Sequence, residues 1–385
     1  MSPHSDIVVI GAGVHGVSAA FHLAGRGRTV TVVDRGAPAG GPTGRSSAVC
    51  RAYYTNAWLA AVARESLDML ARFEDEVGGP SGWVHTGALF LHGAGDVDQV
   101  RRTSAMLNGL GTSVSLLDAD ALEAAHPRLN PSGLALGAWE EGAGYADPVT
   151  TTNSMLAGAR ARGAEVRLFT RVHHIGLRDG GGAVVHTDDG GQLACDRLLV
   201  CAGPWTRPLL EGVGVSLPLR VERHITGTFG WGGAARLPHA IADVPGGYYL
   251  RPDGTERFLV GPLHEEPVAD PDDFDEAVGP DEEHRLVDMV QRRIPDLGAA
   301  EVRAGWASLY DVSPDWQPVI GEVADGIFVD AGTSGHGFKL APALGRRVAD
   351  LVCGDAVPGI EQFHPRRFDT DSRLGAGYAG AQILG

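Results

Sequence analysis

The beginning of the chain places a glycine-rich turn directly between a short apolar strand and a helix, and this arrangement strongly constrains the fold. The turn is Gly11-Ala12-Gly13-Val14-His15-Gly16. It follows an expected strand over 6–10 and opens an expected small-residue helix over 14–25. A second apolar stretch over 29–33 predicts a strand that ends in Asp34. Together these segments predict a βαβ unit of the dinucleotide-binding type.

Each part of this unit has a physical role in binding a dinucleotide. Gly11 permits the tight turn, Gly13 lets a pyrophosphate approach the backbone, and Gly16 lets the helix pack closely on the strand. The helix N-terminus offers free N–H groups and a positive dipole to the phosphates. Asp34 can accept a hydrogen bond from a ribose hydroxyl and would repel a 2′-phosphate, which disfavours NADP. The alternative is a turn that serves packing alone, and the pattern by itself does not separate FAD from NAD.

Composition and charge exclude several classes of protein. The net charge of −16 is unsuited to nucleic acid, which needs a concentrated basic face. We find no apolar run of membrane-spanning length and no charged region typical of a secretory signal at the start. The four cysteines, at positions 50, 195, 201 and 353, form no Cys-x-x-Cys pair, which disfavours a zinc site and fits a reducing cytoplasm. We therefore expect a cytoplasmic protein with a small-molecule substrate, no metal and no membrane or nucleic-acid partner; a homo-oligomer stays open.

The remaining pattern predicts an α/β domain interrupted by a second domain. Helices are expected over 56–77, 148–162 and 340–351, and strands over 165–169, 198–200 and 327–330. Short strands over 247–250 and 258–260, between glycine and proline turns, favour an antiparallel sheet. The acid-rich run over 265–284 predicts a solvated loop that leads into a helix over 282–293. The predicted domains are 1–85, 145–215 and 321–385 for the dinucleotide, and 86–144 and 216–320 for the substrate.

One residue type is almost absent from the chain. Lys339 is the only lysine among 32 lysine and arginine residues, and it ends a glycine-rich loop over 332–339. An ammonium group is a compact charge that can lose its proton when buried, whereas a guanidinium stays charged. Lys339 is therefore a candidate functional residue, with chance retention under a compositional bias as the alternative.

Five further segments carry a family resemblance. They are Thr43-Gly44-Arg45-Ser46-Ser47-Ala48-Val49-Cys50-Arg51, the stretch 171–175, the stretch 198–205, the stretch 306–315, and Gly332-Thr333-Ser334-Gly335-His336-Gly337-Phe338-Lys339. The chain resembles the flavoprotein family of D-amino acid oxidase and sarcosine oxidase, most closely its sarcosine oxidase-like branch, from residue 7 to about residue 350. The resemblance implies an α/β fold in which a Rossmann-like FAD-binding domain (GR2-type) is interrupted by an α+β substrate domain with a mainly antiparallel sheet.

The resemblance implies FAD as the cofactor. A reduced flavin is anionic at N1 and O2, so it needs backbone donors, a helix N-terminus or a cation nearby. Trp205 and Trp306 are expected to pack beside the cofactor. The predicted cofactor-binding residues are Gly11, Gly13, Val14, His15, Gly16, Asp34, Arg35, Thr43, Arg45, Ser46, Ser47, Val172, Ala202, Gly203, Trp205, Gly332, Gly335, His336, Gly337, Phe338 and Lys339.

The same resemblance implies five catalytic candidates: Arg51, Tyr249, Tyr310, His336 and Lys339. Arg51 matches the arginine that binds the substrate carboxylate, for which a bidentate fork is suited; a salt bridge or a pyrophosphate contact is its alternative. Tyr249 and Tyr310 fall at positions of substrate-pocket tyrosines, with ordinary packing as the alternative. His336 lies near the flavin in the family, or else caps the loop. Lys339 is placed to supply charge to the flavin edge or to a carboxylate.

Two departures from the family pattern affect the expected chemistry. The cysteine that attaches flavin in monomeric sarcosine oxidases falls on Ser308, so we expect FAD to be held non-covalently. Those oxidases use a lysine to activate oxygen, and the matching stretch here, over 258–261, contains none. His264 lies off the aligned position. Transfer of electrons to an acceptor other than O2 therefore becomes a credible alternative.

These observations predict an FAD-dependent oxidoreductase that oxidises the C–N bond of a secondary amine or amino acid, such as sarcosine, an imino acid or a D-amino acid. Hydride would pass to flavin N5 and leave an imine. One alternative is an NAD-dependent dehydrogenase that uses the same glycine turn. Another is a flavin-binding subunit that passes electrons to a partner protein.

Overall fold

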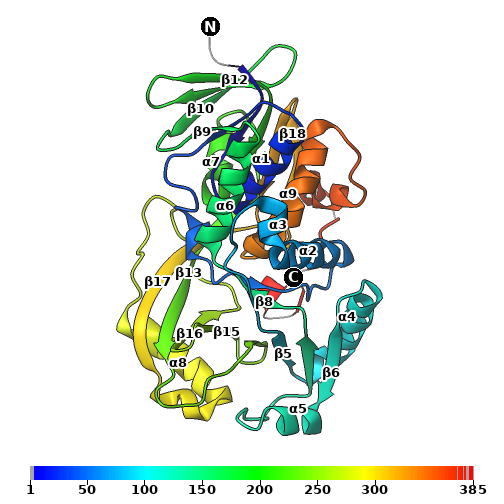
Figure 1. Ribbon diagram of the computed structural model, residues 1–385, viewed down its shortest axis with the longest axis vertical. Helices are drawn as coiled ribbons and strands as arrows, with labels where there is room; N and C mark the ends of the chain where they lie inside the picture. The colour runs from blue at the N-terminus through cyan, green and yellow to red at the C-terminus, as the bar shows by residue number, and fades with distance from the viewer. Residues whose placement is uncertain (1–3, 371, 376, 379–380, 385) are drawn as a thin grey trace.

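The chain forms two large β-sheets at opposite ends of the molecule, with helices packed around them (Figure 1). A computed structural model describes residues 4–370, 372–375, 377–378 and 381–384. A small sheet of three short strands, β3 (Val49–Cys50), β8 (Gly144–Tyr145) and β4 (Val84–His85), connects segments between the two. The fold is that of a Rossmann-like domain with a mainly antiparallel second domain, as predicted.

The first sheet contains the predicted βαβ unit. Strands β1 (His4–Ile10) and β2 (Val30–Val33) pair in parallel, and β12 (Gln192–Val200) pairs in parallel with β1 and with β19 (Ile327–Ala331). The sheet is completed by β9 (Glu165–Arg167), β10 (Val172–Leu177), β11 (Ala183–Thr187) and β18 (Val319–Ala324). β2 is buried along its whole length, as a parallel strand between covering layers must be.

Helices pack on this sheet and on one another. α1 (Val14–Gly25) contacts both α9 (Gly337–Cys353) and α6 (Pro148–Ala161), and α2 (Ala57–Ala71) contacts α9. Figure 1 shows these helices grouped in the upper half of the molecule. The other α-helices are α3 (Phe73–Val77), α4 (Val97–Gly109), α5 (Ala119–Ala125), α7 (Thr206–Glu211) and α8 (Pro280–Arg293).

The second sheet presents one face to its own core and the other to the rest of the molecule. Its strand order is β17 (Glu301–Val312), β13 (Arg220–Gly230), β16 (Arg257–Pro262), β15 (Tyr248–Asp253), β14 (Ala240–Asp243), β5 (Ala88–His92), β7 (Leu136–Glu140) and β6 (Val114–Asp118). All pairs are antiparallel except β14 with β5. Helix α8 covers one face, where Leu286 is buried with Val260. Tyr249 and Tyr310 lie on the other face, against the core that contains Phe338.

Several predicted boundaries are corrected by local geometry. The helix predicted over 56–77 is two helices, α2 and α3, separated at Arg72, and the Asn56 side chain caps the first of them. The strand predicted over 165–169 ends at Arg167, and Phe169 has a positive φ of 53°. The helix predicted over 340–351 begins at Gly337, so Lys339 lies in its first turn and not in the preceding loop.

The strand ranges of the two large sheets are compatible with the predicted division into a dinucleotide domain and a substrate domain. β18 begins at Val319, two positions before the predicted boundary at 321. The division itself stays a prediction.

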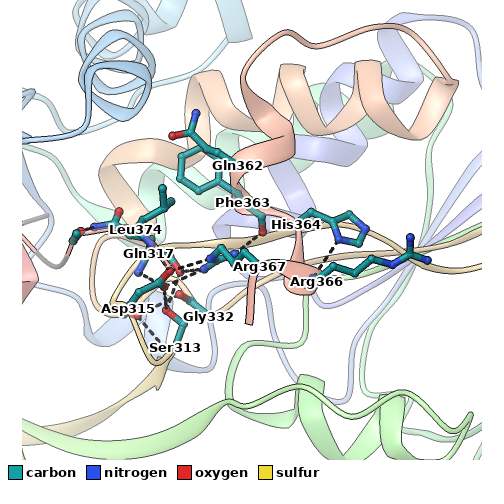
Figure 2. Close-up of polar contacts among 12 residues, drawn as sticks. Ser313, Asp315, Gln317, Gly332, Gln362, Phe363, His364, Arg366, Arg367 and Leu374 are labelled. Atoms are coloured by element: carbon teal, nitrogen blue, oxygen red, sulfur yellow. Dashed lines mark hydrogen bonds and ion pairs between the residues drawn. The ribbon is translucent and has the colours of Figure 1, made fainter. Parts of the chain in front are cut away.

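A buried ion pair joins the loop after β17 to a short 3-10 helix, η6 (Pro365–Phe368) (Figure 2). Arg367 donates from Nε to Asp315 Oδ2 at 2.8 Å and from Nη2 to Asp315 Oδ1 at 2.9 Å. Both side chains are almost completely buried. Burial opposes ionisation of Asp315, but the pair with Arg367 and two backbone donors hold its pKa below the ordinary value.

We expect Asp315→Ala to lower the free energy of unfolding by about 3 kcal/mol, because it leaves the Arg367 guanidinium buried without its partner. Urea denaturation of the purified protein measures the change. Asp68→Ala is the control, since Asp68 pairs with Arg64 at the surface and its loss should cost less than about 1 kcal/mol. Equal destabilisation by the two variants would contradict the role assigned to the buried pair.

Candidate active site

A cavity of about 1060 Å³ lies at the carboxyl edge of the first sheet. Ile10, Val33, Cys201 and Asp330 line it, and they stand at or just beyond the ends of β1, β2, β12 and β19. The cavity extends to β17 of the second sheet, where it is lined by residues 308–311. In α/β folds this edge is the usual place for a nucleotide, and the volume suits a large cofactor.

The glycine turn over 11–16 bounds the cavity as predicted from the sequence. Gly11 has a φ of +113°, and a Cβ at this position would lie 2.3 Å from the Cys201 carbonyl oxygen. A Cβ at Gly16 would lie 2.0 Å from the Gly11 carbonyl oxygen, so Gly16 serves close packing of the turn and does not line the cavity. Gly13 is the N-cap of α1 and provides no side-chain cap, which leaves N–H groups at the helix start for a ligand.

Asp34 is held at the end of β2 by two backbone donors. Its Oδ2 accepts from the Ala12 N–H at 2.6 Å, and its Oδ1 accepts from the Gly36 N–H at 2.7 Å. The carboxylate lines the cavity beside the glycine turn. This fixed position is compatible with the ribose contact predicted for Asp34.

His15 links the two helices that begin at the cavity. Its Nδ1 lies 2.8 Å from Asp330 Oδ2, and its Nε2 lies 3.0 Å from the Gly337 carbonyl oxygen. Both ring nitrogens therefore face acceptors, an arrangement that favours the doubly protonated ring. Burial opposes this charge, but Asp330 and, at a greater distance, Asp311 raise the pKa of His15. The sequence analysis selected His15 but missed Asp330, which is adjacent only in the folded structure.

The start of α9 forms the opposite wall of the cavity. Gly335, Gly337 and Phe338 line it, and the N-cap residue His336 makes no capping hydrogen bond through its side chain. Gly332 does not line the cavity; its N–H donates to Asp311 Oδ2 at 2.6 Å and fixes the turn. The uncapped helix start therefore offers N–H donors to a ligand.

The acid-rich run over 265–284 is a loop up to α8, as predicted, but it also covers the cavity. Asp272 accepts from Arg35 Nη1 and from Trp205 Nε1, each at 2.9 Å. Glu276 accepts from Arg45 Nη2 at 2.7 Å. Pro271 and Phe274 line the cavity with them. Charge spacing in the sequence gave no sign of these pairs, because their arginine partners are more than 230 positions away.

The predicted catalytic residues come together at the end of the cavity formed by β17 and α9. Tyr310 lines the cavity, while Arg51, Lys339 and His336 are buried behind its wall. Arg51 Nη2 donates to the Ile383 carbonyl oxygen at 2.9 Å, and Nη1 donates to the Tyr53 carbonyl oxygen. Neither a salt bridge of Arg51 nor its contact with the pyrophosphate-binding turn is found in the described part of the chain.

Lys339 is a buried amine close to the guanidinium of Arg51. Burial, followed by repulsion from Arg51, lowers the pKa of Lys339 to about 7. Within the described ranges, its ammonium group forms no hydrogen bond or ion pair. The nearby carboxyl of Glu140 is occupied by the N–H groups of Ala52 and Tyr53, at 2.7 and 3.0 Å, and burial raises its pKa to about 7.

His336 is a neutral imidazole. It is fully buried, and its ring lies 5.5 Å from that of Tyr54. Burial, then Lys339 and Arg51, lower the pKa of His336 well below 6.5. Its side chain makes no capping hydrogen bond, and its place near the flavin stays a prediction beside the alternative of a core histidine.

The two predicted tyrosines lie on the face of the second sheet that meets the cavity. The Tyr249 hydroxyl bonds the side chains of Ser47 and Thr226. Tyr310 stacks on His224 with ring centroids 3.8 Å apart, and His224 Nε2 lies 3.0 Å from Glu222 Oε2. The sequence analysis missed His224, since it belongs to no motif. Strand alternation from Thr226 would have placed it on the same face.

The remaining predicted residues are placed as follows. Those that line the cavity are Gly11, Gly13, Val14, His15, Asp34, Arg35, Thr43, Arg45, Ser46, Val172, Ala202, Gly203, Trp205, Gly335, Gly337 and Phe338. Ser47 lies behind it as a partner of Tyr249. Trp306, expected to pack beside the cofactor, does not line the cavity, and its Nε1 donates to the Arg45 carbonyl oxygen at 2.9 Å.

The structure also shows where the two departures from the family pattern lie, at Ser308 and on β16. Ser308 lines the cavity. A covalent thioether bond to flavin would need a cysteine thiol at this position, and Ser308 has a hydroxyl instead. On β16, the face shared with Tyr249 carries Leu259 and Gly261, so no amine is present there. His264 is partly exposed and lies 3.4 Å from Glu266. No cluster of metal-ligating side chains and no helix long and apolar enough to cross a membrane is found among the described residues.

The sequence pattern of the family described as FAD dependent oxidoreductase matches residues 6–351. The chain belongs to this family. The resemblance stated from the motifs is thereby confirmed, the protein is an enzyme, and FAD is its cofactor. This cofactor fits the starts of α1 and α9, where the N-cap residues make no side-chain capping bond. It also fits the glycine backbone at Gly13 and the volume of the cavity. The NAD-dependent alternative is set aside.

Relatives of known activity cover nearly the whole chain. It is 29% identical to monomeric sarcosine oxidase of Streptomyces avermitilis, across 95% of this chain and 98% of that protein. It is 27% identical to glycine oxidase of Geobacillus kaustophilus, across 91% and 94%. The solved structure of L-proline dehydrogenase from P. horikoshii is similar with a TM-score of 0.86 at 24% identity, covering 96% and 99%, which shows the shared fold.

We expect Gly11→Ala to weaken FAD binding at least tenfold and to lower the melting temperature, because the new Cβ would meet the Cys201 carbonyl oxygen in a left-handed backbone conformation. Flavin fluorescence quenching by apoprotein gives the dissociation constant. Gly27→Ala is the matched control, since Gly27 has a φ of +74° and open space around it. It should cost about 1 kcal/mol of stability and leave FAD affinity unchanged; an unchanged affinity in Gly11→Ala would contradict the role of the turn.

Proposed function

We propose that the protein oxidises the C–N bond of a small amino acid or secondary amine that carries a carboxylate. The supporting observation is that the Arg51 guanidinium and the Lys339 amine are buried together beside the cavity end formed by Tyr310 and Gly335. No carboxylate in the described part of the chain forms an ion pair with either of them. Buried charges in proteins are ordinarily paired, and a substrate carboxylate would supply the missing partner. The printed activities of the sarcosine oxidase and glycine oxidase relatives agree with this substrate class.

The side chains around this end would bind and orient the substrate. Arg51 and Lys339 would hold the carboxylate, and the neutral ring of His336 can accept a hydrogen bond from the amine and leave its lone pair free. Tyr310 and Tyr249 would close the space above and exclude water. When bound, FAD accepts a hydride at N5, and the substrate leaves as an imine. The protein contributes position and electrostatics.

Anaerobic reduction of the flavin tests this function directly. We expect loss of visible flavin absorbance with sarcosine, glycine, L-proline or D-alanine, and much slower loss with dimethylamine, which is sarcosine without its carboxylate. In Arg51→Ala the KM for the carboxylated substrate should rise about 100-fold, the effect of about 3 kcal/mol, with no change for dimethylamine. A flavin that none of these compounds reduces would sink the proposal.

The electron acceptor belongs to the same proposal. Since β16 offers Leu259 and Gly261 where an oxygen-activating lysine would be needed, we propose an acceptor other than O2, such as a quinone or a partner protein. In the experiment above, admission of air should reoxidise the flavin slowly, whereas a redox dye should do so quickly. Rapid reoxidation by air would assign an oxidase instead.

Carboxylate binding should depend on pH through Lys339. Its pKa of about 7 means that it is protonated below this pH and neutral above it. An anion binds the protonated form better, so affinity should be greatest below pH 7 and fall up to tenfold per pH unit above it. Titration of the flavin spectrum with pyrrole-2-carboxylate between pH 6 and 9 measures this. Lys339→Met should remove most of the dependence and leave the smaller, same-signed contribution of Glu140; an unchanged profile would exclude Lys339.

We also propose a cytoplasmic location. Cys50, Cys195, Cys201 and Cys353 are all free thiols, and the first three are buried. Burial raises the pKa of Cys50 to about 12 and that of Cys195 to about 11, so these thiols are packing residues. Free thiols that carry no structural disulfide are characteristic of proteins in a reducing compartment.

A further inference from the structure

A segment that follows Thr370 returns to the catalytic residues. It is described at residues 372–375, 377–378 and 381–384 and is called here the covering segment. Its first part is held beside the buried Asp315–Arg367 pair (Figure 2). The Leu374 N–H donates to Asp315 Oδ2 at 3.1 Å, and Gln317 Nε2 donates to the Gly375 carbonyl oxygen at 2.9 Å. These contacts hold Leu374 and Gly375 against the loop that carries Asp315 and Gln317.

The later part of the covering segment packs at the junction between the two large sheets, where Figure 1 shows the red end of the described chain. The Tyr378 hydroxyl donates to the Tyr53 hydroxyl at 2.9 Å, and the two rings are stacked. Ile383 Cδ1 reaches within 2.8 Å of the position that a Cβ on Gly335 would take. Gly335 lines the cofactor cavity, so the segment touches the wall of that cavity.

The contact with Arg51 has the clearest consequence. Its two terminal nitrogens donate to the carbonyl oxygens of Tyr53 and Ile383. A carboxylate bound bidentately would need two donors of the same guanidinium fork. The Ile383 carbonyl occupies one terminal nitrogen of this fork, so a carboxylate bound through both terminal nitrogens has to displace it or share that nitrogen's second N–H.

We propose that the covering segment is a displaceable occupant of the carboxylate site, and that carboxylated substrates bind by replacing the Ile383 carbonyl on Arg51. This inference rests on the proposed function. The exchange is favourable because both partners are charged when a carboxylate binds Arg51, whereas the carbonyl that it replaces is a neutral acceptor. The anchor at Asp315 and Gln317 stays in place, so the residues described at 377–378 and 381–384 are the ones that move. Amines without a carboxylate cannot displace it, and the segment thereby contributes to specificity.

Because only molecules with the segment open can bind the carboxylate, closure of the segment should weaken the apparent affinity in inverse proportion to the fraction of open molecules. We would titrate FAD-loaded protein with pyrrole-2-carboxylate, read by the flavin spectrum, in four forms. A chain truncated after Thr370 should bind the probe at least tenfold more tightly than the full chain. Tyr378→Phe keeps the ring and loses the bond to Tyr53, so it should bind a few-fold more tightly even if the truncated chain does not fold. Thr370→Val is the matched control and should bind as the full chain does.

Hydrogen exchange of the full chain provides the second measurement. Saturating probe should increase amide exchange in peptides over 377–384 and leave exchange in peptides over 313–317 unchanged. Equal probe affinity in the full chain, the truncated chain and Tyr378→Phe, or exchange that slows on binding, would overturn the displacement while leaving the carboxylate site intact. Absence of any probe binding, in every form, would overturn the carboxylate site together with the displacement.

Discussion

Two helices, α1 and α9, begin at one cavity, and neither N-cap residue closes its helix with a side-chain hydrogen bond. The N–H groups at a helix start have no partner within the helix and carry partial positive charge, so they require an acceptor. His15 joins the two starts, because its ring reaches Asp330 on one side and the Gly337 carbonyl oxygen on the other. The sheet, the glycine turn and the loop before α9 all serve to bring these ends together, and FAD, which carries a diphosphate at one part and an electron-accepting ring at another, can satisfy both.

The substrate end depends on a different balance of charge. Arg51 and Lys339 are buried together, and their repulsion contributes to the lowered pKa of Lys339. Glu140, a buried acid that interacts with Arg51, is held by backbone N–H groups, and burial raises its own pKa, so it compensates the charge of Arg51 weakly. Burying these groups without an anion lowers the stability of the folded protein, and binding an anion restores part of that stability. The carbonyl of Ile383 offers a partial substitute from within the chain, which connects the covering segment to the same electrostatic requirement.

Much of the nucleotide half could be predicted because its determinants are local. The turn over 11–16 and the strand that ends in Asp34 lie within about 30 residues, and their spacing specifies the βαβ unit. The helix start at Gly337 was placed three residues too late, since propensity alone assigns a glycine to the loop. The pairs of Asp330 with His15 and of Asp272 with Arg35 were missed, because each joins positions that are hundreds of residues apart.

The sequence by itself determined the family, the cofactor, the class of fold and the short list of chemically active side chains. Each of these depends on residue types at fixed short spacings, as in the glycine turn and the segment that ends in Lys339. Only the tertiary structure decided the electrostatic state of those side chains: which cations lack a carboxylate, which imidazole is charged, and which backbone carbonyl reaches Arg51. Burial and long-range packing set these properties, and they cannot be assigned until segments from both ends of the chain meet at one site.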